Sequence, residues 1–177
     1  MAEFDFEKLI VDLPDYPEPG VVFKDITPLL ADKDGFAAVV DSIAAHFEGR
    51  GVTKVVGAEA RGFMVGAPVA RALNAGFVPA RKPGKLPREA FSESFELEYG
   101  TDTLQIHVDA ITSDDVVLIV DDLVATGGTA NAQARLVKRA GAKLVGMGFL
   151  MELEFLNPRE TIAQETDVEV FSLVQVK

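Results

Sequence analysis

The chain has 177 residues, of which 48% are hydrophobic and 25% charged, and its formal net charge is −11. This length and composition predict a single globular domain over residues 1–177 with a substantial core. The absence of cysteine excludes disulfides and thiolate chemistry, and the acidic balance argues against non-specific nucleic-acid binding. Because neither a secretory signal nor a membrane-spanning run is visible, we expect a cytoplasmic location and no membrane partner.

The N-terminal part of the chain predicts short elements. A brief helix is expected over residues 4–10, before Pro14, and an extended piece over residues 21–23. Apolar residues at helical spacing then predict a helix that begins at its cap, Asp34, and ends at Glu48.

Strand–helix–strand alternation follows this helix. Residues 52–57 and 76–80 are predicted strands, and residues 63–73 form the expected helix between them. Strands joined through a helix by short turns are typical of a parallel α/β sheet.

Residues 81–104 interrupt the alternation. A connection this long in a compact domain is usually either a functional lid or a disordered segment. The segment opens with a cluster of basic side chains and continues with aromatic residues that alternate with acids, which favours a flexible lid that pairs with residues 104–108. The basic cluster consists of Arg81, Lys82, Lys85 and Arg88.

The most informative stretch is residues 116–140. Residues 116–120 are β-branched or aliphatic, which predicts a strand buried on both faces. Asp121 and Asp122 are expected to end this strand, and a turn of small residues leads into a helix over residues 130–140. The turn consists of Ala125, Thr126, Gly127, Gly128 and Thr129.

Strand, glycine turn and helix N-terminus together predict an anion site. Free backbone N–H groups and the helix dipole favour a phosphate, and the glycines let it approach closely. The paired acids would repel a phosphate, but they suit a ribose 5-phosphate if they accept hydrogen bonds from sugar hydroxyls or help to hold a Mg²⁺. An ordinary strand–turn–helix with a solvated acid pair is the alternative interpretation.

The last part of the chain predicts a strand over residues 144–151, a short helix over 158–164 and a closing edge strand over 168–174. No internal repeat or low-complexity tract is visible in the sequence. The expected strands and helices therefore form one α/β domain, not an array of repeats.

The central stretch resembles the 5-phosphoribosyl-1-pyrophosphate (PRPP) motif of type I phosphoribosyltransferases. Further segments look like the adenine phosphoribosyltransferases, in that family's order and spacing. These segments are Asp15-Tyr16-Pro17, Phe23-Lys24-Asp25-Ile26-Thr27-Pro28, Glu59-Ala60-Arg61-Gly62-Phe63, Arg81-Lys82-Pro83-Gly84-Lys85-Leu86-Pro87 and Leu97-Glu98-Tyr99-Gly100-Thr101.

The resemblance implies a fold and a reaction. The fold is the α/β type I phosphoribosyltransferase fold, with a central, mostly parallel sheet flanked by helices, a small hood from about residues 1–30 and 152–177, and a lid over about 81–104. The reaction transfers the phosphoribosyl group from PRPP to adenine and gives AMP and pyrophosphate. Mg²⁺ would be bound mainly through PRPP, with Asp121 and Asp122 as candidate contacts, and a homodimer is expected.

The resemblance also implies residue roles. Phe23 and Leu123 would flank the adenine ring, whose edge would be read by backbone groups near Val22 and Lys24. Glu98 would act as the acid/base, Arg61 would be a second catalytic residue as a charged donor to pyrophosphate, and Tyr99 would organise the lid. Ribose and its 5′-phosphate would contact Asp121, Asp122, Ala125, Thr126, Gly127, Gly128 and Thr129. Pyrophosphate would contact Glu59, Ala60, Arg61, Arg81, Lys82 and Lys85, with a cis peptide bond between Glu59 and Ala60.

Two other functions fit the same fold. One is an enzyme acting on hypoxanthine, guanine or xanthine, against which the Phe23 segment and Glu98 argue. The other is a PRPP-sensing regulator of the kind found among purine repressors. Such regulators carry an added DNA-binding domain or a basic surface, and this acidic chain predicts neither.

Overall fold

The computed structural model describes residues 4–96 and 100–177, and its centre is a five-stranded sheet. Every neighbouring pair of strands in this sheet is parallel. In spatial order the strands are β4 (Gly76–Ala80), β3 (Lys54–Ala58), β7 (Val116–Val124), β8 (Lys143–Leu153) and β9 (Val170–Val176). The parallel α/β sheet predicted from the sequence is thereby confirmed.

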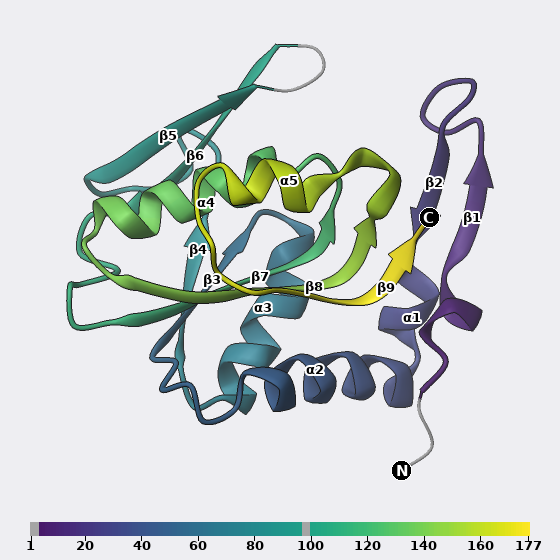
Figure 1. Ribbon diagram of the computed structural model, residues 1–177, viewed down its shortest axis with the longest axis horizontal. Coiled ribbons are helices and arrows are strands. Elements are labelled where there is room, and N and C mark those ends of the chain that lie inside the picture. The colour runs from purple at the N-terminus through teal and green to yellow at the C-terminus, as the bar shows by residue number, and fades with distance from the viewer. Residues whose placement is uncertain (1–3, 97–99) are drawn as a thin grey trace.

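Helices cover both faces of the sheet (Figure 1). One face carries α2 (Lys33–Phe47) and α3 (Arg61–Ala72), and the other carries α4 (Gly128–Arg139) and α5 (Pro158–Ala163). The central strand β7 supplies fully buried residues to two hydrophobic cores. Val117 and Ile119 belong to the α4 side, and Leu118 and Val120 to the α2–α3 side. The alternation confirms that this run is buried on both faces.

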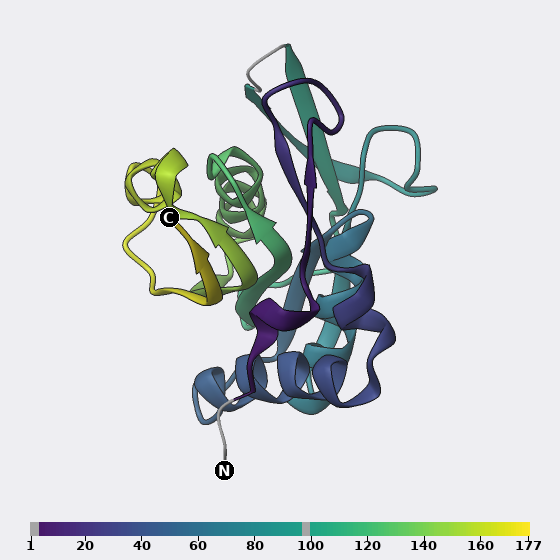
Figure 2. The same cartoon turned by 90° about the vertical axis from the view of Figure 1, so that its right-hand side faces the viewer.

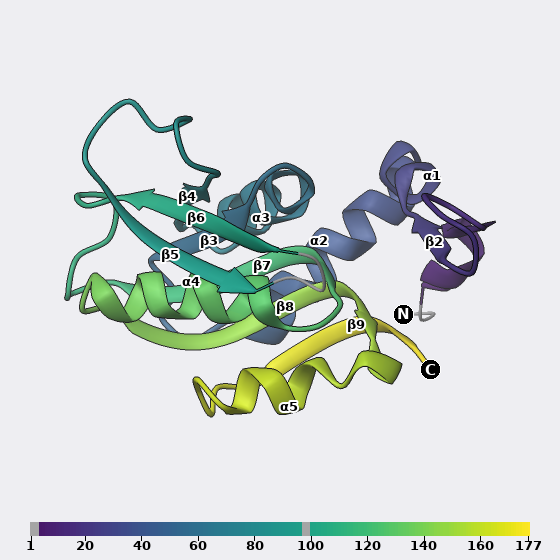
Figure 3. The same ribbon diagram turned by 90° about the horizontal axis from the view of Figure 1, so that it is seen from above.

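Two antiparallel hairpins stand away from the sheet on the same side of the molecule (Figures 1 and 2). One pairs β1 (Val11–Pro14) with β2 (Val22–Asp25), and the other pairs β5 (Ala90–Glu96) with β6 (Thr101–His107). Seen from above, β5–β6 lies beside α4, whereas β1–β2 stands at the far end with α1 (Thr27–Ala31) (Figure 3). The predicted pairing between residues 104–108 and the lid segment is confirmed by the second hairpin.

Three local predictions are wrong. The opening helix is only a 3₁₀ turn, η1 (Phe6–Leu9), and strand β1 follows it. The α2 cap is Asp32 rather than Asp34, since the Asp32 carboxylate accepts the backbone N–H groups of residues 34 and 35. The acid pair does not end β7, because pairing with β8 continues to Val124.

A second 3₁₀ turn, η2 (Glu154–Leu156), joins β8 to α5. In the part of the chain that the structure describes, no helix combines the length and apolarity that crossing a bilayer requires.

Candidate active site

The site lies where the sheet changes its winding direction. From β3 the chain passes through α3 to β4 on one side, and from the neighbouring β7 it passes through α4 to β8 on the other. In open α/β sheets such a switch point leaves a crevice at the carboxyl ends of the two strands. A cavity of about 380 Å³ opens there, lined by residues 58–62, residues 121–127, Thr129, Ala130, Gln133 and Phe149.

The glycine turn presents the N-terminus of α4 to this cavity. Gly127 has a φ of +89°, a left-handed conformation that favours glycine. A β-carbon there would also lie 2.9 Å from the carbonyl oxygen of Pro158. Within the described residues, no side chain caps the N-terminus of α4. The turn therefore offers backbone N–H groups and a helix dipole to an anion, as the sequence predicts.

The two acids Asp121 and Asp122, within β7, are buried and interact with each other. Asp121 is 7% exposed and Asp122 5%, and Oδ1 of Asp121 accepts the N–H of Asp122 at 2.9 Å. Burial, followed by the charge of Asp122, raises the pKa of Asp121 well above its ordinary value. The pair can thus offer hydrogen-bond acceptors to a sugar while one member resists ionisation.

The first turn of α3 contacts both acids. Nε of Arg61 lies 3.0 Å from Oδ2 of Asp122. Gly62 brings the main chain so close to Asp121 that any β-carbon there would clash. The peptide bond between Glu59 and Ala60 is cis, which confirms the expectation for this turn. Residues 58–62 and the acid pair therefore form one packed unit.

The basic cluster reaches the edge of the same cavity through Glu59. The Glu59 carboxylate accepts hydrogen bonds from the Lys85 ammonium and from the backbone N–H of Lys82, and Nε of Arg81 lies 3.5 Å away. Burial raises the pKa of Glu59, but these donors outweigh it, so the net pKa lies below the ordinary value. The Lys82 ammonium instead pairs with Asp102 at 2.9 Å. Arg81, Lys82 and Lys85 thus lie around Glu59 at the edge of the cavity.

The residues predicted to bind a base come from two strands, β2 and β7. Leu123 lines the cavity, and the ring of Phe23 on β2 lies 5.7 Å from the Arg61 guanidinium carbon. The Lys24 ammonium bonds both carboxylate oxygens of Asp12 on β1 at 2.7 Å, so its side chain is engaged within the hairpin. Val22 is about half exposed. This arrangement leaves the backbone of β2, rather than the Lys24 side chain, for base contacts.

Glu98 and Tyr99, the predicted acid/base and lid residues, lie outside the described residues.

The acid pair suits only a metal ion whose other ligands come from water or from the substrate. Among residues 4–96 and 100–177, no group of three or more His, Cys, Asp or Glu side chains could hold a metal ion. Mg²⁺ is commonly bound through one or two carboxylates, with water and phosphate oxygens completing its shell. Asp121 and Asp122 match that donor set.

Sequence reasoning missed two of the residues that line the cavity, Phe149 and Gln133. Phe149 is a core-like residue without a chemical signature. Gln133 could have been found, because it lies three and four residues before the buried Leu136 and Val137. A polar residue on the apolar stripe of a helix is the signal.

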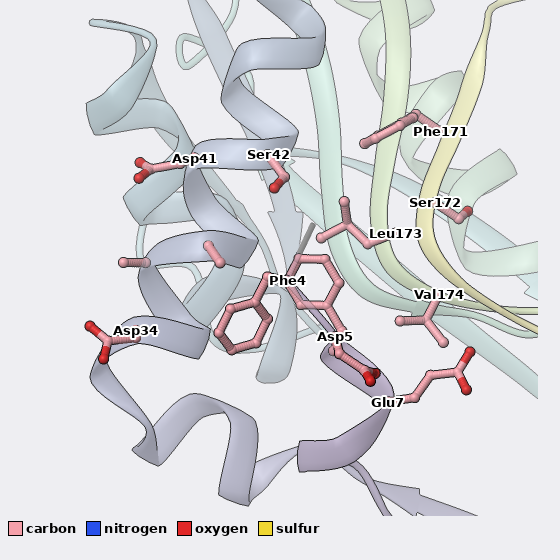
Figure 4. A pocket seen from close by; sticks show the side chains of 13 residues that line it. Phe4, Asp5, Glu7, Asp34, Asp41, Ser42, Phe171, Ser172, Leu173 and Val174 are labelled. Atoms are coloured by element: carbon pink, nitrogen blue, oxygen red, sulfur yellow. The ribbon is translucent and has the colours of Figure 1, made fainter. Parts of the chain in front are cut away.

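A larger hollow of about 1130 Å³ lies elsewhere, between η1, α2 and β9 (Figure 4). Apolar groups such as Phe4, Phe171 and Leu173 share its wall with acids. Its charged lining residues in the described part of the chain are Asp5, Glu7, Asp34 and Asp41. An acidic wall suits a phosphorylated ligand poorly, so the smaller cavity is the better candidate.

Comparisons with known proteins show what the whole chain resembles. A family model described as the phosphoribosyl transferase domain matches residues 28–177. The adenine phosphoribosyltransferase of Myxococcus xanthus is 56% identical over 161 residues, covering 91% of this chain and 88% of that protein.

Solved structures give the same result. The Giardia lamblia enzyme complexed with 9-deazaadenine superposes with a TM-score of 0.93 at 37% identity, over 100% of this chain and 99% of that one. The Saccharomyces cerevisiae enzyme complexed with adenine and an imino-altritol bisphosphate has a TM-score of 0.88 at 38% identity, over 95% and 96%. The fold is therefore similar to theirs.

Proposed function

The chain belongs to the adenine phosphoribosyltransferase family, and we propose that the cavity at the ends of β3 and β7 is where it performs that family's reaction. It transfers the 5-phosphoribosyl group from PRPP to adenine, forming AMP and pyrophosphate. The observation that carries the assignment is the convergence of the glycine turn, the acid pair and Arg61 in one cavity.

The 5′-phosphate binds in the turn formed by residues 125–129. Free N–H groups at the start of α4 donate to its oxygens, and the hydroxyls of Thr126 and Thr129 add donors. The carboxylates of Asp121 and Asp122 accept hydrogen bonds from the ribose hydroxyls. These contacts fix the anomeric carbon relative to the incoming base, which is the main contribution a protein makes to a displacement at that carbon.

Pyrophosphate leaves towards the turn at residues 58–62. Arg61 offers a planar, permanently charged donor, and Lys85 and Lys82 offer mobile point charges. Glu59 and Asp102 hold these lysines before the substrate binds, and the developing negative charge of pyrophosphate competes for them. Neutralising that charge lowers the barrier to breaking the bond between the anomeric carbon and pyrophosphate.

Adenine lies between Phe23 and Leu123, and backbone groups near Val22 and Lys24 read its edge. The base must lose a proton as the new bond forms, and Glu98 is our candidate acceptor, with Tyr99 organising the closing segment. Residues 81–104 act as the lid, and residues 1–30 together with 152–177 act as the hood. Closure excludes water, which would otherwise hydrolyse PRPP.

Mg²⁺ bound with PRPP would supply positive charge that offsets the repulsion between the diphosphate and this acidic chain. Asp121 and Asp122 are the residues that would contact it. The family resemblance further supports an isologous homodimer with the basic cluster near its interface, which light scattering would test. Because both substrates are metabolites of the cell interior, we place the reaction in the cytoplasm.

The test is product formation from PRPP and Mg²⁺ with adenine, hypoxanthine, guanine or xanthine in parallel. We expect AMP and stoichiometric pyrophosphate with adenine, and little product with the other bases. Efficient turnover of an oxopurine instead of adenine would contradict the assignment of the base. PRPP binding without pyrophosphate release from any base would favour a sensor over an enzyme.

A further inference from the structure

Gln133 is a buried polar side chain that lines the candidate cavity. It lies in α4, is 0% exposed, and lines the cavity together with Ala58 and Phe149. Thr129 precedes it by four residues, so both side chains share one face of the helix, and Thr129 lines the same cavity. Gln133 therefore lies one helical turn beyond the glycine turn and faces the same space.

The amide of Gln133 has no hydrogen-bond partner among residues 4–96 and 100–177. Both Nε2 and Oε1 are buried and unpaired within that part of the chain. Its helical neighbours Ala132 and Ala134 are buried and apolar. Leaving a buried amide unpaired costs free energy, and native proteins rarely do so without a functional reason.

Asn131, two residues earlier, shows what a structural amide does in this helix. Its Nδ2 donates to the carbonyl oxygen of Thr161 at 2.8 Å and so ties α4 to α5. The Oδ1 atom of Asn131 is unpaired within the described residues, but Asn131 does not line the cavity. Gln133 makes no such tie there, and its side chain borders the ligand space.

We propose that Gln133 is a further binding residue for the phosphoribosyl group, to which Nε2 donates a hydrogen bond directly or through one water. The inference rests on the proposed function of this cavity. An amide suits the position, because it supplies a donor and an acceptor without the cost of burying a charge when no ligand is bound. Its hydrogen bonds are completed only in the complex.

The test compares Gln133→Met, which keeps the length of the side chain and removes the amide, with wild type. The probes are ribose 5-phosphate and adenine, titrated separately by calorimetry, and unfolding is followed without ligand. We expect roughly tenfold weaker binding of ribose 5-phosphate, unchanged binding of adenine, and a higher Tm of the unliganded variant. Gln164→Met, at an exposed glutamine, is the matched control and should change none of these.

A second variant covers the case in which Gln133→Met folds poorly. Gln133→Glu places a carboxyl group at the same point, where burial would raise its pKa. We expect it to bind ribose 5-phosphate worse than wild type at pH 8 and to recover relative to wild type at pH 5.5, once it is protonated and can donate. A purely structural role for Gln133 would produce no such recovery.

Two negative results have different meanings. If wild type forms AMP and binds ribose 5-phosphate, but Gln133→Met binds it equally well, the role of Gln133 is wrong and the function stands. If wild type neither forms AMP nor binds ribose 5-phosphate, both the proposed function and this inference are wrong.

Discussion

The main chain at Gly62 passes so close to the carboxylate of Asp121 that a β-carbon built there would lie 2.6 Å from Oδ1. Gly62 is in the first turn of α3, and Asp121 is near the end of β7. Both residues are buried. The absence of a side chain at residue 62 therefore lets residues 58–62 and the acid pair share one cavity.

Gly62→Ala is expected to disturb this contact. The Asp121 carboxylate is packed within a strand and cannot swing away, so the first turn of α3 must shift instead. Overpacking of this kind typically costs about 1–3 kcal/mol, and we expect at least tenfold lower kcat/KM for PRPP. Chemical denaturation and steady-state kinetics check both effects.

The control for Gly62→Ala is Gly76→Ala. A β-carbon at Gly76 would meet only the flexible side chain of Lys54, at 3.2 Å. This variant should keep wild-type kinetics. Equal activity of the two alanine variants would show that the close approach at Gly62 is not needed.

Asp121→Asn is expected to stabilise the protein at high pH. Because the pKa of Asp121 is raised above its ordinary value of 3.8, the folded state holds a proton that the unfolded chain loses. Wild-type stability therefore falls as pH rises from about that value towards the raised pKa. The gain in Tm on substitution should be largest at pH 8 and smallest near pH 4. A gain that does not depend on pH would argue against a raised pKa.

Asp121 and Asp122 together are expected to be essential for turnover. The double variant Asp121→Asn, Asp122→Asn weakens the acceptors for the ribose hydroxyls and removes charge beside Arg61. We expect AMP formation to be abolished while the far-ultraviolet circular dichroism spectrum stays unchanged. A near-normal rate in a folded double variant would show that the two acids are not needed for the reaction.

Much of this architecture could be predicted from local sequence. The run Val116–Val120 and the small-residue turn that follows it carry strong local signals. The run lies in β7, and residues 125–127 and 129 of the turn line the cavity. The parallel order of the sheet follows from strand–helix alternation. These features depend on near neighbours in the chain, which a single sequence displays.

Other features depend on distant parts of the chain. Strand β1 is exposed at all four residues and contains Pro14, so only its pairing with β2 makes it a strand. The extension of β7 past Asp121 depends on pairing with β8. Likewise, the role of Gln133 depends on which face of α4 borders the cavity, and tertiary packing decides that.

Lys85→Met is expected to raise the KM for PRPP roughly tenfold and to leave the KM for adenine unchanged. Lys85 contacts Glu59 at the edge of the cavity. Pyrophosphate bound there would pair with the Lys85 ammonium in place of Glu59. The control is Arg88→Met in the same cluster, because Arg88 pairs with Asp109 instead. A larger rise in the KM for PRPP with Arg88→Met than with Lys85→Met would contradict the proposal that Lys85 binds the pyrophosphate.

Arg159→Met tests how much the ion pair between α5 and β8 stabilises the fold. Arg159 donates two hydrogen bonds of 2.8 Å to Glu152, which is 1% exposed. Breaking a buried pair costs roughly 3–5 kcal/mol, and the half-exposed position of Arg159 reduces our expectation to about 2 kcal/mol. Urea denaturation at pH 7 measures the loss.

The loss on removing Arg159 should depend on pH. The hydrogen bonds from Arg159 lower the pKa of Glu152 in spite of its burial. The pair therefore stabilises the fold above the ordinary pKa of 4.5 and loses that effect as pH falls below it. The difference between wild type and Arg159→Met should shrink at pH 4. The double variant Glu152→Gln, Arg159→Met should recover part of the loss at pH 7.

The most direct test of the account is a crystal structure with AMP bound. We predict that its 5′-phosphate accepts hydrogen bonds from the backbone N–H groups of residues 125–129, with the ribose hydroxyls on Asp121 and Asp122. AMP bound elsewhere, with the glycine turn unoccupied, would contradict the assignment of this cavity.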